Sequence, residues 1–252
     1  MCAVAETAAV AGIFRERPSG LRVLMYHALG SPVLGDAREI FGVSPASFEA
    51  HMAALGELAD TRIIDTSAYR PDGQPLQVAI TFDDGYADNL HVAAPILERY
   101  GFPFTVFAVS EFVRRNAAPY LSVHELRELA MRPGVSIGTH GATHVPLTQC
   151  DDRTLANELL SSKHFLEDTI GRPVTTVAYP FGAVDRRVRA AAERAEYTLG
   201  FTSHFDINSP LRDPLLMART SILGIDTVRV FKQKLCGDWD WYRWRSTDPA
   251  AT

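Results

Sequence analysis

Short apolar runs alternate along this chain with longer segments in which apolar residues recur at helical spacing. Runs typical of buried strands are predicted at residues 21–26, 62–64, 78–82, 104–109, 135–138, 175–179, 198–202 and 217–222. Helices are predicted between them, at residues 44–58, 89–100, 122–130, 151–170, 184–195 and 227–235. This repeated alternation of strand and helix indicates a parallel α/β architecture.

The strand predicted at residues 78–82 ends in two adjacent acids, Asp83 and Asp84, followed by Gly85. Like charges raise each other's pKa, so two neighbouring carboxylates are costly to hold together. A bound cation would remove that cost. The alternative is a solvated Asx turn after the strand.

A second motif, Thr-His-Gly-Ala-Thr-His, places His140 and His144 four residues apart. The two side chains can face one cation if the segment turns like a helix. One carboxylate and two imidazoles leave coordination positions open, which is typical of a catalytic site. These ligands suit Zn²⁺, and also Co²⁺ or Ni²⁺. Taken alone, the histidine pair could be a surface coincidence.

The candidate residues share a position relative to the predicted strands. His27, the acid pair, His140 and the segment Pro180–Phe181 each follow directly after a strand. The carboxyl ends of the strands form one rim of a β/α barrel, and active sites are built there. We therefore expect these residues to lie together at that rim.

Three motifs together resemble those of the polysaccharide deacetylases, carbohydrate esterase family 4. They are TFDDG at residues 81–85, HGATH at 140–144 and AYPFG at 178–182. The resemblance implies a distorted (β/α) barrel of about seven strands. It also implies a metal-dependent N-deacetylase that hydrolyses the acetamide of an N-acetylated amino sugar in a glycan or glycan precursor.

The resemblance also implies a role for each motif residue. Asp83 would be the general base, while Asp84, His140 and His144 would be the metal ligands. The backbone amide of Phe181 would donate to the oxyanion that forms in the reaction. The alternative for the 179–182 segment is a simple turn with an aromatic lining.

The chain departs from the family pattern at two places. The family commonly has an arginine that orients the base, and Ala178 stands at that position. The late Leu-x-His motif that supplies a general acid is missing around residues 217–219. His27 ends the first predicted strand instead. This resembles the branch of poly-N-acetylglucosamine deacetylases, in which the motif is permuted to the front, and it implies that His27 is the acid. The alternative is a structural histidine that caps the strand.

Length and composition support one domain. The 252 residues are 46% hydrophobic, which is enough for a large core. We expect an extension at residues 1–20, a barrel domain at 21–235 and a tail at 236–252. The tail holds an aromatic-rich stretch, residues 238–244, which could stack on sugars but is expected to pack on the barrel. His204 lies in a predicted loop and could touch substrate.

Charge and cysteine content limit the partners and the compartment. A net charge of −5 and a pI of about 5.9 give no reason to expect nucleic acid or an anionic membrane as a partner. The three cysteines are widely spaced and odd in number, so they do not suggest a disulfide framework. No apolar run approaches membrane-spanning length, and residues 1–12 are a poor signal peptide. The sequence therefore predicts a cytoplasmic protein. The oligomeric state is open.

Two other functions fit the same motifs. One is a deformylase or another small-amide C–N hydrolase on the same scaffold, since the metal site alone does not select the acyl group. The other is a non-catalytic carbohydrate-binding protein, to which the missing arginine at Ala178 gives weight.

Overall fold

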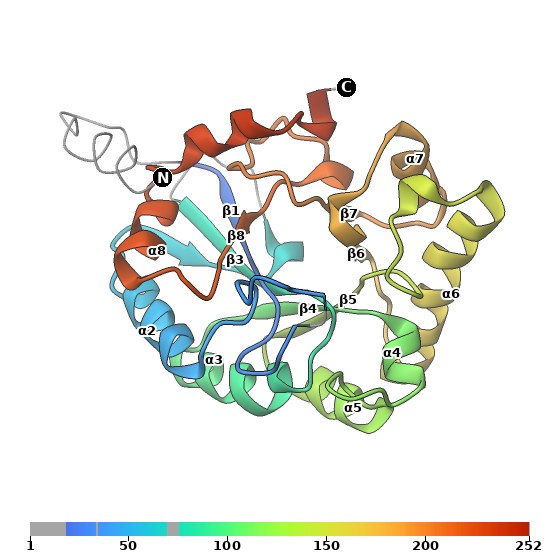
Figure 1. The fold of residues 1–252 in the computed structure, drawn as a ribbon, viewed down its shortest axis with the longest axis horizontal. Helices are drawn as coiled ribbons and strands as arrows, with labels where there is room; N and C mark the ends of the chain where they lie inside the picture. Colours follow the sequence, from blue (N-terminus) through green and yellow to red (C-terminus); the bar gives the residue numbers. More distant parts are fainter. Residues whose placement is uncertain (1–18, 34, 70–75, 252) are drawn as a thin grey trace.

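The computed structural model describes residues 19–33, 35–69 and 76–251, and it is built around one curled, parallel β-sheet with helices outside it (Figure 1). The strands are β1 (Leu21–Tyr26), β2 (Thr61–Ile63), β3 (Leu76–Phe82), β4 (Phe104–Ala108), β5 (Val135–Thr139), β6 (Thr176–Ala178), β7 (Leu199–Phe201) and β8 (Thr220–Ser221). Their order is β7-β6-β5-β4-β3-β1-β8, and β2 adds to β3. This path of seven strands confirms the predicted distorted barrel.

The helices lie on the outer face of the sheet (Figure 1). They are α2 (Pro45–Gly56), α3 (Ala94–Tyr100), α4 (Ser110–Arg114), α5 (Val123–Met131), α6 (Asp152–Ile170), α7 (Arg186–Arg194) and α8 (Val228–Leu235). A π-helical turn, η2 (Asn89–Ala93), leads into α3. Short 3₁₀ turns are η1 (Thr66–Ala68), η3 (Leu147–Gln149), η4 (Pro180–Gly182), η5 (Pro214–Leu216), η6 (Asp240–Arg245) and η7 (Pro249–Ala251).

Local sequence signals account for several helix ends. Side chains of Ser44, Ser122, Asp151 and Thr227 accept a backbone N–H and begin α2, α5, α6 and α8. Gly101 ends α3 in the left-handed conformation that glycine adopts readily. The predicted helices are therefore confirmed, while α4 is an additional short helix that the periodicity did not indicate. Most of the extension expected at residues 1–20 lies outside the described residues.

The strand predicted at residues 217–222 is wrong as one continuous element. Met217 forms a parallel bridge to Phe201 of β7, and only Thr220–Ser221 pairs with β1. Between these pairings the Asn208 side chain accepts from the Ala218 amide at 2.7 Å and donates to the Ala218 carbonyl at 2.9 Å. At Ala218 the Asn208 side chain thus takes the place of a neighbouring strand. The segment passes from β7, at one edge of the sheet, to β1, near the other edge, and so closes the barrel.

Apolar side chains fill both faces of the sheet, as expected for parallel strands covered by helices. The larger cluster lies between the strands and the outer helices and includes Leu24, Ile80 and Val106. A smaller cluster on the opposite face includes Val23, Ala79 and Phe107. The alternation of these residues along β1 and β3 fixes which side chains point toward the outer helices.

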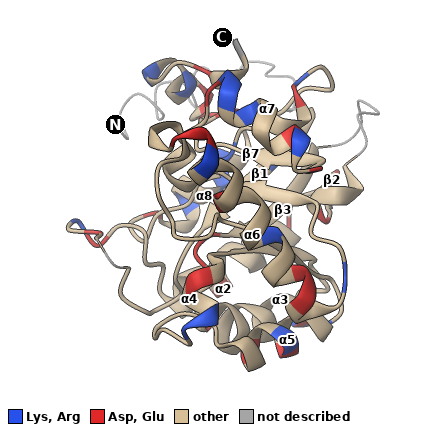
Figure 2. Cartoon of the chain, turned by 90° about the vertical axis from the view of Figure 1, so that its right-hand side faces the viewer, with Lys and Arg blue, Asp and Glu red and all other residues tan. Residues whose placement is uncertain are grey.

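Charged residues of both signs are interspersed over the helices (Figure 2). Arg132, for example, pairs with Glu98 and Glu128 at 3.0 and 3.2 Å. Among the described residues, no helix is both long and apolar enough to cross a membrane.

The C-terminal tail packs on the barrel, as the sequence predicts. Trp239 is buried in a small cluster with Phe205, whereas Trp244 is 76% exposed. Arg212 binds Asp248 through two hydrogen bonds of 2.9 and 2.7 Å, which ties the tail to the loop after β7.

Candidate active site and metal centre

The structure brings the predicted site residues together at one rim of the barrel. Asp83 and Asp84 follow β3, His140 follows β5 and Phe181 follows β6. Tyr26 of β1 lies opposite Phe82 of β3, and the Asp83 amide donates to the Tyr26 carbonyl at 2.9 Å. His27 therefore lies beside Asp83, although 56 positions separate them in the sequence. The expected location at the carboxyl ends of the strands is confirmed.

Three side-chain atoms converge where the sequence predicts metal ligands. The Oδ1 atom of Asp84 lies 3.5 Å from Nε2 of His140 and 3.3 Å from Nε2 of His144. Tetrahedral zinc with bonds of about 2.1 Å holds its ligand atoms about 3.4 Å apart. Asp84 Oδ1 is also buried and has no hydrogen-bond partner among the described residues. The three residues thus fit a divalent metal ion.

The protonation states of these three residues also suit a divalent metal ion. Burial and the neighbouring Asp83 raise the pKa of Asp84 to about 7, a cost that a cation would relieve. Burial lowers the pKa of His140 to about 3, so its ring is neutral. The ring Nδ1 lies 2.8 Å from the Ala178 carbonyl, which can only accept, so Nδ1 carries the proton. Nε2 therefore presents its lone pair toward Asp84, as in metal-binding histidines.

The two histidines do not reach the site through a helical turn, and that expectation is wrong. Gly141 and His144 have φ values of 76° and 60°, so residues 140–144 form a loop. Amides of Ser110 and Glu111, in the first turn of α4, donate to the carbonyls of Gly141 and Ala142 at 3.2 and 3.0 Å. The left-handed backbone, rather than helical spacing, aims His144 at Asp84.

Asp83 is held by Arg219, a residue that belongs to none of the sequence motifs. Nη1 and Nη2 of Arg219 donate to Oδ1 and Oδ2 of Asp83 at 2.6 and 2.8 Å, and Nε donates to the Thr202 carbonyl at 2.8 Å. Burial would raise the pKa of Asp83, but the guanidinium outweighs it and holds that pKa well below its usual range. Arg219 supplies the contact expected from an arginine at Ala178. A charged residue inside an apolar predicted strand was the available signal.

His27 follows β1, which lies on the other side of β3 from β5, the strand that leads into His140. Its ring packs against Phe41 at 5.0 Å between centroids, and Nδ1 is buried with no hydrogen-bond partner among the described residues. Burial lowers the pKa of His27, while the nearby Asp83 carboxylate opposes the shift. A poorly solvated imidazole beside a carboxylate can hold a proton and deliver it to a bound substrate.

Phe181 lies at the tip of a tight turn with a left-handed φ of 59°. The next residue must be glycine, because a Cβ on Gly182 would lie 2.0 Å from Oγ of Ser203. Ser203 Oγ in turn donates to the Phe181 carbonyl at 3.3 Å, which fixes this turn. Phe181 is 64% exposed, and its ring centroid lies 4.7 Å from that of His144, so the ring borders the metal-ligand cluster.

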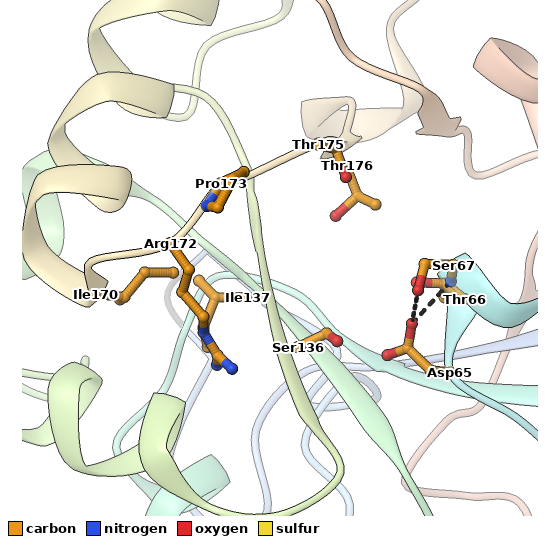
Figure 3. A pocket seen from close by; sticks show the side chains of 10 residues that line it. All are labelled: Asp65, Thr66, Ser67, Ser136, Ile137, Ile170, Arg172, Pro173, Thr175 and Thr176. Carbon is orange, nitrogen blue, oxygen red and sulfur yellow. Dashed lines mark hydrogen bonds between the residues drawn. The ribbon is translucent and has the colours of Figure 1, made fainter.

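Other polar clusters lie apart from these residues. A cavity of about 180 Å³ is lined by hydroxyl groups, including those of Thr66, Ser136 and Thr176, with Asp65 and Arg172 (Figure 3). Ser136 and Thr176 lie near the amino-terminal starts of β5 and β6, away from the rim that holds the acids.

A second His/Asp group consists of His204, Asp206 and Asp248. Arg243 pairs with Asp206 at 3.3 Å and Arg212 with Asp248 at 2.7 Å. These guanidinium groups already neutralise both carboxylates, so the group is less suited to a cation than Asp84 with its unpaired oxygen. His204 donates to or accepts from Ser246 at 3.1 Å and so contacts the tail.

Comparison with known proteins relates the chain to one family. A sequence model of the family "Polysaccharide deacetylase" matches residues 71–200. YxkH of Bacillus subtilis (strain 168), whose name places it among the polysaccharide deacetylases, is 30% identical over 198 residues, covering 77% of this chain and 68% of its own length. The peptidoglycan-N-acetylglucosamine deacetylase of Bacillus cereus is 32% identical over 122 residues, which cover 48% of this chain and 53% of that enzyme.

A solved structure extends the likeness to the fold. BA0330 of Bacillus anthracis, whose name also places it among the polysaccharide deacetylases, superposes with a TM-score of 0.76 at 29% identity. The alignment covers 87% of this chain and 69% of BA0330. The chain belongs to the polysaccharide deacetylase family, carbohydrate esterase family 4, and is a hydrolase of linear amide C–N bonds.

Proposed function

We propose that the chain is a divalent-metal-dependent N-deacetylase that removes the acetyl group from an N-acetylated amino sugar in a glycan or glycan precursor and releases acetate. One observation carries the proposal. The unpaired Asp84 Oδ1 lies within 3.5 Å of two imidazole nitrogens, next to the arginine-held carboxylate of Asp83. A ligand cluster beside a separate, ionised base is the arrangement that metal-assisted amide hydrolysis requires.

Asp84, His140 and His144 would hold the metal ion. When bound, the ion would lower the pKa of a water molecule and polarise the acetyl carbonyl. Zinc suits a site of one carboxylate and two imidazoles, and Co²⁺ or Ni²⁺ would fit the same donors.

The chain's own residues perform the proton transfers. Asp83 accepts the proton of the attacking water at a carboxylate oxygen. Arg219 keeps this carboxylate ionised and fixed in direction through its two hydrogen bonds. Asp83 is a weak base in this setting, so it functions only toward a water whose own pKa has been lowered. The bound ion would lower the pKa of that water, so the base must lie next to the metal ligands.

Phe181 and His27 serve the carbonyl oxygen and the leaving nitrogen. The Phe181 amide donates to the oxyanion of the tetrahedral intermediate, a contact typically worth about 3 kcal/mol of barrier. His27 delivers a proton to the amine nitrogen, which leaves poorly unless protonated. Collapse of the intermediate then breaks the C–N bond and yields acetate and a free amino sugar.

One relative and the exposed Phe181 side chain support this substrate class. The B. cereus relative is named for N-acetylglucosamine in peptidoglycan, which supports an acetamido sugar here. The exposed Phe181 ring at the rim offers an apolar face on which a sugar ring can pack.

The test is a screen of N-acetylglucosamine oligomers with separate detection of acetate and free amine. The protein is stripped with a chelator and assayed before and after addition of Zn²⁺, Co²⁺ or Ni²⁺. We expect turnover only with added metal, and none for Asp84→Ala. N-formyl oligomers are run in parallel, and a preference for formate release would identify a deformylase instead.

A further inference from the structure

The loop that carries both histidine ligands rests on a buried carboxylate from a neighbouring helix. Glu158 lies in the middle of α6 and is 2% exposed. Its Oε2 accepts from the amides of Ala142 and Thr143 at 2.7 and 3.0 Å. Its Oε1 accepts from Oγ1 of Thr143 at 2.6 Å. All three hydrogen bonds go to residues between the two ligands.

The contact is close and leaves little room for another arrangement. A Cβ on Gly141 would lie 3.0 Å from Oε2 of Glu158. The carbonyls of Gly141 and Ala142 are bound from the other side by the first amides of α4. Two successive amides that point at one anion form a backbone nest, which stabilises a negative charge. The loop is therefore clamped between α4 and the Glu158 carboxylate.

The two histidines depend on this clamp to different degrees. His140 is oriented by its own hydrogen bond from Nδ1 to the Ala178 carbonyl and is 3% exposed. His144 has a side chain that is 23% exposed, and ring contacts with Phe112, His140 and Phe181 surround it. His144 also adopts a left-handed backbone, which a non-glycine residue keeps only when its surroundings impose it. Its direction toward Asp84 thus depends on the backbone at Thr143.

We infer that Glu158 is a positioning residue for the metal centre: by binding the Ala142 and Thr143 amides and the Thr143 hydroxyl, it holds His144 in the direction needed to bind the ion with Asp84 and His140. Glu158 itself is not a ligand, since its oxygens are occupied by the loop. The inference rests on the proposed metal-dependent function and assigns to α6 a part in it.

The experiment measures metal affinity in the full chain by competition with a chromophoric chelator. Glu158→Ala leaves two amides and a hydroxyl without their acceptor, and loss of such an outer partner typically weakens metal binding about 10- to 100-fold. Glu158→Gln can still accept both amides through its oxygen and donate to the Thr143 hydroxyl. We expect its affinity to stay close to that of the parent protein.

Glu167→Ala is the matched control. Glu167 lies on the same helix, and its Oε1 accepts from the Val174 amide at 3.0 Å, remote from the metal ligands. This variant loses a comparable side-chain-to-backbone contact, so thermal unfolding should shift in both alanine variants while metal affinity falls only in Glu158→Ala. The visible absorption of the Co²⁺ form gives a second readout, since a displaced His144 changes the ligand geometry.

The outcomes separate the two proposals. If the parent protein binds metal and Glu158→Ala binds it equally well with the same Co²⁺ spectrum, the positioning role is overturned and the metal centre stands. If the parent protein binds no metal, the proposed function fails and this inference fails with it. If Glu158→Ala does not fold, metal affinity is measured in Thr143→Ala, which removes one of the three contacts. An unchanged metal affinity in that variant would count against the clamp.

Discussion

Arg219 and Asp83, 136 residues apart in the sequence, form a buried bidentate ion pair with N–O distances of 2.6 and 2.8 Å. Their side chains are 1% and 3% exposed. Arg219 lies in the closing segment, between Met217, which pairs with β7, and β8, which pairs with β1, and Asp83 follows β3. The ion pair therefore forms only when the barrel is complete, and it couples closure of the fold to the orientation of the base.

The first prediction concerns this pair. Arg219→Ala should lose most turnover because Asp83 is left undirected. It should also destabilise the protein by about 3–5 kcal/mol, since a buried charge loses its partner. Metal content, measured by elemental analysis, should stay near that of the parent protein. Arg212→Ala is the control, because Arg212 makes a similar bidentate pair with Asp248 in the tail. Equal activity losses in both variants would refute a specific role for Arg219.

The second prediction concerns the metal ligands. One divalent ion should bind per chain, and His140→Ala or His144→Ala should lower its occupancy because each removes one of three protein ligands. His91→Ala serves as the control, since His91 is exposed and pairs with Glu125 at the start of α5. Elemental analysis of the purified proteins gives the answer, and unchanged metal in both ligand variants would rule out the site.

The third prediction separates the two adjacent acids. Asp83→Asn should abolish turnover while metal stays bound, because a base is lost and a ligand is not. Asp84→Asn should weaken metal binding itself. Asp83→Asn also leaves the Arg219 guanidinium without its anion, so its melting temperature should fall, and assays must be run well below it. Near-normal activity of Asp83→Asn would make the assignment of the base wrong.

The fourth prediction concerns the general acid. His27→Ala should retain fold and metal but lose about 10²–10⁴ in rate on an acetamide, because the amine then leaves without a proton. The loss should be much smaller on an activated ester, whose leaving group needs none. Equal losses on amide and ester would indicate a positioning role. No loss on either substrate would make His27 a purely structural residue.

The carboxyl rim of the barrel was predictable because its information is local. An apolar run indicates a strand, and the residues directly after it are the side chains that the strand positions. Asp83 and Asp84 follow one such run, and His140 follows another. Parallel strands then place those side chains at one edge whatever the details of the loops. The same reasoning brought His27 to the site, since β1 and β3 pair in register through Tyr26 and Phe82.

The missed features depend on contacts between distant segments. The convergence of His140 and His144 was expected from helical spacing, yet it arises from left-handed backbone that α4 and Glu158 hold in place. Neither periodicity nor residue spacing encodes that clamp. The short α4 was missed for a related reason: its five residues are too few to show a helical period.

The sequence by itself determined which residue types are present for the chemistry: one acid and two histidines for a metal, a second acid and a third histidine for proton transfer. Only the tertiary structure decided how the base is oriented. With Ala178 at the expected position, the guanidinium comes from Arg219, because Asn208 interrupts the closing strand and the Arg219 side chain extends inward to Asp83. The local preferences of a strand cannot specify which residue supplies the guanidinium. The ion pair is strong because it is buried, and that burial exists only once the barrel has closed.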